Sequence, residues 1–115
     1  MKLVNRTLDR VVCQRIELAR TIWSRTRGLL GRPPLARGEG LIIEPCQSVH
    51  MFFMRHAIDV VFLDLDYRVV ALRPDLRPWR VTRYFRDAYA ALELPAGAVA
   101  QAGLELGHHL ALEGD

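Results

Sequence analysis

PCQSVHMFFMRHAIDVVFLDLD, residues 45–66, is the stretch of the sequence that decides the fold. It places His50 and Asp59 in a run that is otherwise rich in β-branched and aromatic side chains, which favour strands. A buried polar side chain without a partner costs about 1 to 3 kcal/mol, so each of these two residues needs a hydrogen-bond partner or a function. The stretch therefore predicts buried strands with a polar site between them.

Short apolar runs on both sides of this stretch extend the predicted sheet. Apolar and polar residues alternate at positions 11–16, as they do in a half-buried strand. Further strands are predicted at residues 41–43, 49–54, 58–64, 68–72, 88–94 and 109–112. Pro74 and Pro78 are expected to keep residues 73–80 out of any regular element.

Two short helices are predicted beside the strands. Apolar residues recur at intervals of three and four after Thr21, the expected N-cap, and Gly31 followed by two prolines ends that helix. An Ala-rich helix is expected over residues 96–102, closed by Gly103. These elements predict one α+β domain over residues 1–115, with a small curved or barrel-like, mainly antiparallel β-sheet.

The composition of the chain excludes membrane-spanning helices and some kinds of metal site. No apolar run approaches the roughly 20 residues of a membrane span, so we expect a cytoplasmic protein with no membrane partner. The cysteines, Cys13 and Cys46, are then expected to be reduced thiols, and two cysteines cannot build a four-cysteine zinc site. The chain has 16 Lys and Arg against 13 Asp and Glu, and Lys2 is its single lysine. The arginine excess gives weak support for an anionic partner.

Four blocks in order give the chain a family resemblance: RTRGLLGRPPLARGEGLIIEPC, SVHMFFMRHAIDVVFLD, RPWR and LELPAG. Together they resemble the bacterial and archaeal family called domain of unknown function 192, or uncharacterised protein family 0127. The resemblance implies a small β-rich domain in its short cytoplasmic form without a leader, and it implies no established activity. Matching positions include Arg27, Arg32, Cys46, His50, Met54, Asp59, Trp79, Arg80 and Glu93. Departures from the family pattern are Met51, His56, Ala57 and His108, which remove a hydroxyl, a rigid turn and a carboxylate.

A candidate site follows from alternation in the central stretch. His50, Phe52 and Met54 share one face if residues 49–54 form a strand. A four-residue connection would place Asp59 on that face, where its carboxylate could orient the imidazole, whereas a three-residue connection would place it on the other. The alternative interpretation is a structural histidine in a hydrogen-bond network.

The leading functional hypothesis is a non-catalytic module that binds a small anionic molecule in a mostly apolar pocket. Its predicted ligand-binding residues are Arg27, Arg32, His50, Met54, Asp59, Trp79 and Arg80. One alternative is an RNA or single-stranded DNA accessory protein that uses Trp79 and the arginines at 77, 80, 83 and 86. Another is a hydrolase or transferase with His50 as general base. Cys46, His50 and His56 lack the usual metal-ligand spacing, so no metal or cofactor is predicted.

Overall fold

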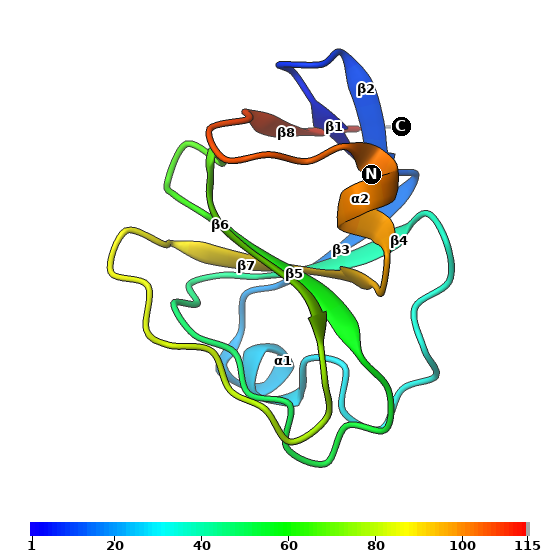
Figure 1. The fold of residues 1–115 in the computed structure, drawn as a ribbon, viewed down its shortest axis with the longest axis vertical. Helices are drawn as coiled ribbons and strands as arrows, with labels where there is room; N and C mark the ends of the chain where they lie inside the picture. The colour runs from blue at the N-terminus through cyan, green and yellow to red at the C-terminus, as the bar shows by residue number, and fades with distance from the viewer. Residues whose placement is uncertain (115) are drawn as a thin grey trace.

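The computed structural model describes residues 1–114, which form two open β-sheets and two short helices (Figure 1). The smaller sheet has the order β2–β1–β8, made of β2 (Arg10–Cys13), β1 (Lys2–Asn5) and β8 (Leu110–Glu113). The larger sheet has the order β3–β4–β7–β5–β6, made of β3 (Arg15–Ala19), β4 (Glu39–Ile43), β7 (Ala90–Pro95), β5 (Ile58–Leu63) and β6 (Val69–Leu76). The helices are α1 (Ile22–Arg27) and α2 (Ala98–Ala102).

This architecture confirms the predicted α+β class with a mainly antiparallel sheet. Every strand pair is antiparallel except β3 and β4, and neither sheet closes into a barrel. The parallel pair requires a crossover, and residues 20–38, which include α1, provide it. No helix within residues 1–114 is long and apolar enough to cross a bilayer.

The larger sheet is covered on both faces, which explains the nearly continuous apolar sequences of its central strands. One face packs against the smaller sheet and α2, through a core that contains Leu3, Ile42, Val61 and Val99. The other face lies under α1 and the loops at the same end of the molecule, through a core that contains Val60 and Phe62, among others. Alternation along β5 therefore sends Asp59 and Val61 to the α2 face, and Val60 and Phe62 to the α1 face.

Several predicted elements differ from the structure. Residues 49–54 form a loop and not a strand, with a single bridge between His50 and Val81. Residues 11–16 belong to two strands, because Gln14 lies where the chain passes from the smaller sheet to the larger one. The prediction also missed β1.

Of the predictions made for prolines and helix caps, some are confirmed and others are wrong. Pro74 lies inside β6, which contradicts the expectation for residues 73–80. β6 is at the edge of its sheet, where a residue without an N–H can be accommodated. Thr21 is confirmed as the N-cap of α1, but that helix ends at Arg27, with Gly28 as C-cap, and not at Gly31. Gly103 closes α2 as predicted.

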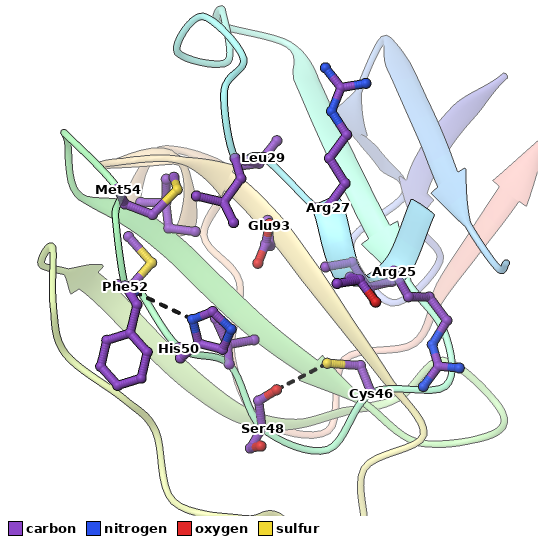
Figure 2. A pocket seen from close by; sticks show the side chains of 16 residues that line it. Arg25, Arg27, Leu29, Cys46, Ser48, His50, Phe52, Met54 and Glu93 are labelled. Atoms are coloured by element: carbon purple, nitrogen blue, oxygen red, sulfur yellow. Dashed lines mark hydrogen bonds between the residues drawn. The ribbon is translucent and has the colours of Figure 1, made fainter. Parts of the chain in front are cut away.

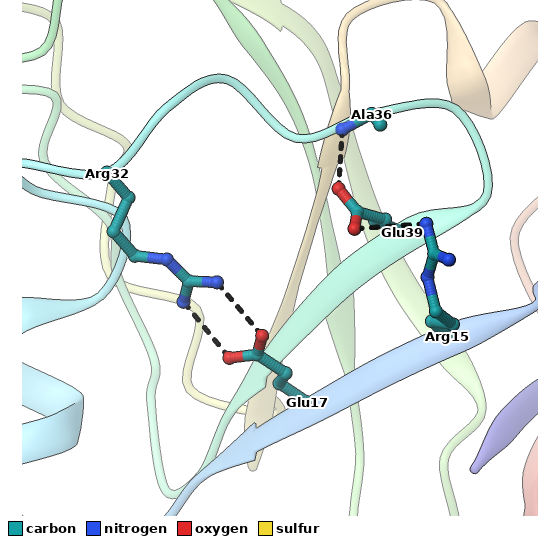
Figure 3. A network of polar contacts seen from close by, with 5 residues as sticks. All are labelled: Arg15, Glu17, Arg32, Ala36 and Glu39. Carbon is teal, nitrogen blue, oxygen red and sulfur yellow. Dashed lines mark hydrogen bonds and ion pairs between the residues drawn. The ribbon is translucent and has the colours of Figure 1, made fainter.

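The loop between α1 and β4 is held to the larger sheet by ion pairs (Figure 3). Arg32 donates two hydrogen bonds to Glu17 of β3, at 3.1 and 2.9 Å. Glu39, at the start of β4, accepts from Arg15 at 3.2 Å and from the backbone N–H of Ala36 at 2.7 Å. These contacts fix the position of the loop that follows α1, next to the pocket described below.

Candidate functional site

A pocket lies between α1, residues 46–54 and the α1 face of the larger sheet (Figure 2). Its cavity has a volume of about 90 Å³, which is enough for a small polar group and a few attached atoms. The end of α1 and the following turn line one side, and the loop from Cys46 to Met54 lines the other. Ile43, Ile58 and Glu93 line it from the sheet.

Glu93 is the ionisable group that the sheet presents to this pocket. It lies on β7 between Leu41 of β4 and Val60 of β5, and only 5% of its surface is exposed. No donor among residues 1–114 makes a hydrogen bond to its carboxylate. Loss of water around the carboxylate raises the pKa of Glu93 to about 7, and the positive charge of Arg32 opposes that rise.

Gly28 forms the wall of the pocket next to this carboxylate. It has φ +49°, a left-handed conformation that favours glycine. A Cβ atom at this position would lie 3.9 Å from Oε1 of Glu93 and 3.6 Å from Cδ1 of Ile43. At Gly28 the chain therefore brings backbone without a Cβ atom up to the buried acid.

Cys46 and His50 line the loop side of the pocket. The Cys46 thiol donates to the Ser48 carbonyl at 3.1 Å, and burial raises its pKa, so it is a protonated thiol and not an activated nucleophile. The His50 ring stacks on Phe52 with centroids 5.0 Å apart, and its Nδ1 accepts from the Phe52 N–H at 3.4 Å. His50 is exposed and lines the cavity, which is the position that a general base would need.

The structure brings three predicted site residues to this pocket and places the others elsewhere. Arg27, His50 and Met54 line it, although Figure 2 shows the Arg27 guanidinium extending away from Glu93. Arg32 does not line this cavity and is paired with Glu17. The predicted arginines therefore do not converge on one point.

Asp59 points to the face of the larger sheet opposite the pocket that His50 lines, so of the two placements left open by the sequence the structure has the one in which these side chains do not pair. Its carboxylate accepts hydrogen bonds from the backbone N–H groups of Asp75 at 2.8 Å, Gly97 at 3.1 Å and Val99 at 2.9 Å. These contacts hold β6 and the start of α2 to β5. Asp59 is a buried acid whose acceptors are satisfied by the fold.

Trp79 belongs to a second feature, an aromatic tip made of Phe52, Phe53 and Trp79. Arg80 follows Trp79 and adjoins the tip. The tip residues are 41%, 72% and 59% exposed, and Trp79 contacts Phe53 and Phe52 with ring centroids 4.9 and 6.1 Å apart. Two backbone hydrogen bonds join its loops, from Met51 to the Arg80 carbonyl at 2.7 Å and from Trp79 to the Met51 carbonyl at 2.8 Å. Phe53 and Trp79 have φ +65° and +69°, which is unusual for bulky residues. The fold thus holds large apolar rings in solvent.

Glu93 is the site residue that the sequence interpretation missed. It was a matching family position, and the signal was a lone acid inside the apolar run of residues 88–94. No group of three or more His, Cys, Asp and Glu side chains in the described part of the chain is placed to hold a metal ion.

Comparison with known proteins identifies relatives of this chain. The sequence profile of the family DUF192, described as "Uncharacterized ACR", matches residues 4–112. The chain belongs to the DUF192 family. A UPF0127 protein of Thermococcus sibiricus is 34% identical over 113 residues, which cover 94% of this chain and 72% of the relative. A UPF0127 protein of Pyrococcus furiosus is 33% identical, over 94% of this chain and 95% of the relative.

A solved structure supports the fold of this DUF192 protein. A protein of unknown function from Novosphingobium aromaticivorans superimposes with a TM-score of 0.83 at 27% identity. The similarity covers 97% of this chain and 84% of the crystallised one. The profile and the relatives confirm the family resemblance, the solved structure confirms the architecture, and the family description specifies no activity.

Proposed function

We propose that this DUF192 protein binds a small ligand in the pocket between α1 and the larger sheet, with Glu93 as the polar anchor. The observation that carries the proposal is that Glu93 is 5% exposed and lines a cavity, while its carboxylate accepts no hydrogen bond from residues 1–114. Buried polar groups in proteins are nearly always paired. A ligand with a complementary group would provide the partner that the fold does not.

The walls restrict what such a ligand can be. Met51, Met54, Ile43 and Ile58 give the cavity apolar surfaces, and His50 and Phe52 add ring faces on the loop side. Small-molecule sites commonly combine mostly apolar walls with a few placed polar groups. We therefore expect a compact ligand with an apolar body and one polar group directed at Glu93.

The anionic ligand predicted from the sequence remains a candidate within this proposal. Arg27 would have to turn inward to reach an anion in the cavity, since its side chain extends outward in Figure 2. Arg80 is exposed and adjoins the aromatic tip. The proposal consequently rests on Glu93 and not on converging arginines. It retains the expectation of a cytoplasmic protein, in which Cys13 and Cys46, both free thiols in the structure, stay reduced.

The test is a ligand screen by thermal shift, with small carboxylates, phosphates, sugar acids, alcohols and amines. A ligand at one hundred times its Kd should stabilise the protein by about 2.7 kcal/mol. The variant Glu93→Gln should lose this stabilisation. Glu105→Gln, at an exposed acid outside the pocket, should keep it. No stabilisation by any compound, or equal stabilisation of both variants, would overturn the proposal.

A second candidate function is binding of RNA or single-stranded DNA, and the aromatic tip favours it. Exposed rings can stack on bases, and the exposed side chains of Arg77, Arg80, Arg83 and Arg86 lie on the segment that carries Trp79. This candidate uses the outer surface of the loops and does not require the cavity.

Fluorescence anisotropy with a labelled mixed-sequence oligonucleotide at low salt tests this second candidate. Trp79→Ala should weaken binding by about 1 to 3 kcal/mol, the contribution of one stacked base. The matched control is Trp23→Ala on α1, where the side chain is also exposed, at 75%. Absence of binding at low salt, or equal loss in the two variants, would exclude the tip as a nucleic-acid site.

A further inference from the structure

We propose that the group bound beside Glu93 is a primary ammonium on a short apolar stem. This inference rests on the proposed ligand-binding function and specifies the chemical class of the ligand. It is carried by the geometry of the acid: Glu93 is 5% exposed, lines the cavity and has no hydrogen-bond donor within residues 1–114. The ammonium could belong to a free amine or to a lysine side chain of a partner peptide.

No arginine within residues 1–114 makes a hydrogen bond or ion pair with the Glu93 carboxylate. An ionised carboxylate only accepts hydrogen bonds, and a buried one requires a charged or strongly donating partner. Of the nearby arginines, Arg32 is bound to both carboxylate oxygens of Glu17, and Arg25 donates from Nε to the Pro45 carbonyl at 3.0 Å. Figure 2 shows Arg27 extending away from Glu93. A donor from outside the chain is therefore the group that this acid can pair with.

The walls of the pocket favour a cation over an anion. The thioethers of Met51 and Met54 and the ring of Phe52 are polarisable apolar surfaces, and aromatic rings attract cations through their faces. An ammonium offers three donors in a small volume, whereas a phosphate or carboxylate would bring its negative oxygens towards those of Glu93. The cavity of about 90 Å³ limits the stem to a few carbon atoms.

Other charged and titratable groups lie around Glu93. Arg25 and Arg27 line the pocket from α1, and Cys46 and His50 line it from residues 46–54. Arg32, in the loop after α1, acts on Glu93 through its charge. Arg27 is exposed, so water and salt screen its repulsion of a bound cation, while Glu93 lies in the low-dielectric interior. The strongest electrostatic interaction of a bound ammonium is then its attraction to the Glu93 carboxylate.

The direction in which the affinity changes with pH distinguishes an ammonium ligand from an anionic one. With a pKa of about 7, Glu93 is partly protonated at neutral pH. An ammonium binds the ionised acid, so binding releases a proton and tightens as the pH rises. An anion binds the protonated acid, so binding takes up a proton and weakens as the pH rises.

Isothermal titration calorimetry with n-propylamine, which is protonated near neutral pH, tests the proposal on the wild-type protein. We expect affinity about tenfold higher near pH 8 than near pH 6, with proton release seen as a dependence on the ionisation enthalpy of the buffer. Parallel titrations use propionate, n-propanol and Nα-acetyl-lysine amide. Binding of the lysine amide in place of propylamine would also support the ammonium class, and would identify a peptide side chain as its source.

Glu93→Gln should abolish amine binding, and Glu105→Gln should leave it unchanged. Circular dichroism checks that both variants are folded, and the pH dependence of the wild type tests the proposal without any variant. Propionate bound with proton uptake, or n-propanol bound as tightly as the amine, would overturn the ammonium class and leave the pocket proposal standing. If none of these probes binds and the wider ligand screen also finds nothing, both proposals are overturned.

Discussion

Two buried acids on neighbouring strands show how far the surroundings of a residue set its behaviour. Asp59 on β5 and Glu93 on β7 point to opposite faces of the larger sheet. Asp59 accepts three backbone hydrogen bonds, whereas Glu93 accepts none from residues 1–114. The first carboxylate is part of the scaffold, and the second has the raised pKa that is typical of functional acids.

Glu93 should make the stability of the protein depend on pH. An unfolded glutamate loses its proton near 4.5, whereas folding raises the pKa of Glu93 to about 7. The folded state therefore binds more protons between these values, and the free energy of unfolding should fall as the pH rises through this range. The decrease from this group should be on the order of 3 kcal/mol.

Urea denaturation near pH 5 and near pH 8 measures this effect, with Glu93→Gln as the comparison, because glutamine does not titrate. The variant should gain stability relative to the wild type at the higher pH. The other titrating groups contribute equally to both proteins. An identical pH dependence in the two proteins would contradict the prediction.

The sequence identified buried polar residues but not their hydrogen-bond partners. His50 and Asp59 drew attention because each interrupts an apolar run, and the same reasoning applies to Glu93. The donors that satisfy Asp59 come from residues 75, 97 and 99, a pairing that no local pattern specifies. Tertiary contacts decide that His50 and Glu93 line the same cavity and that Asp59 does not, so this grouping could not be predicted from spacing.

The predictions of the most apolar strands are confirmed, whereas the structure of the irregular segments was not predicted. The strands β4, β5 and β7 are buried on both faces, and their apolar runs identified them. Residues 49–54 have the composition of a strand, but Phe52 and Phe53 are exposed and Phe53 has positive φ. Backbone hydrogen bonds to residues 79 and 80, which lie in another part of the chain, determine the conformation of that loop.

Gly40 is required by the close packing of β4 against the core between the sheets. A Cβ atom at this position would lie 2.8 Å from Cδ1 of Ile16, 2.9 Å from Sγ of Cys13 and 3.1 Å from Cδ2 of Leu94. Gly40→Ala should therefore destabilise the protein by about 1 to 3 kcal/mol through overpacking, measured by urea denaturation.

Adding Ile16→Val, which removes the closest of these atoms, should recover part of the loss in a double-mutant cycle. Gly114→Ala is the matched control, since a Cβ atom there has no neighbour within 4 Å. Strictly additive effects of the changes at positions 16 and 40 would show that steric overlap is not the cause.

The two cores of the molecule differ in how accessible their cysteines are to reagents in solution. Cys13 lies in the core between the sheets, is 1% exposed, and burial raises its pKa to about 12. Cys46 lies beside the pocket and is only partly buried. Alkylation by iodoacetamide should therefore modify Cys46 in the native protein, and Cys13 only after global unfolding.

Peptide mass spectrometry across a urea series measures the two modification rates separately. Modification of Cys13 should increase over the same urea concentrations at which circular dichroism records unfolding. Equal modification of both cysteines without denaturant would instead indicate that the two sheets separate locally while the rest of the fold persists.

The pairing of β1 with β8 has a consequence for engineering. Lys2 lies opposite Glu113, so the two ends of the described chain lie side by side, and Figure 1 shows them at the end of the molecule away from α1. A short glycine-rich linker could join these ends and produce a circular backbone without crossing the mouth of the pocket. Ring closure reduces the entropy of the denatured chain, so such a cyclic protein should melt at a higher temperature while presenting an unaltered cavity.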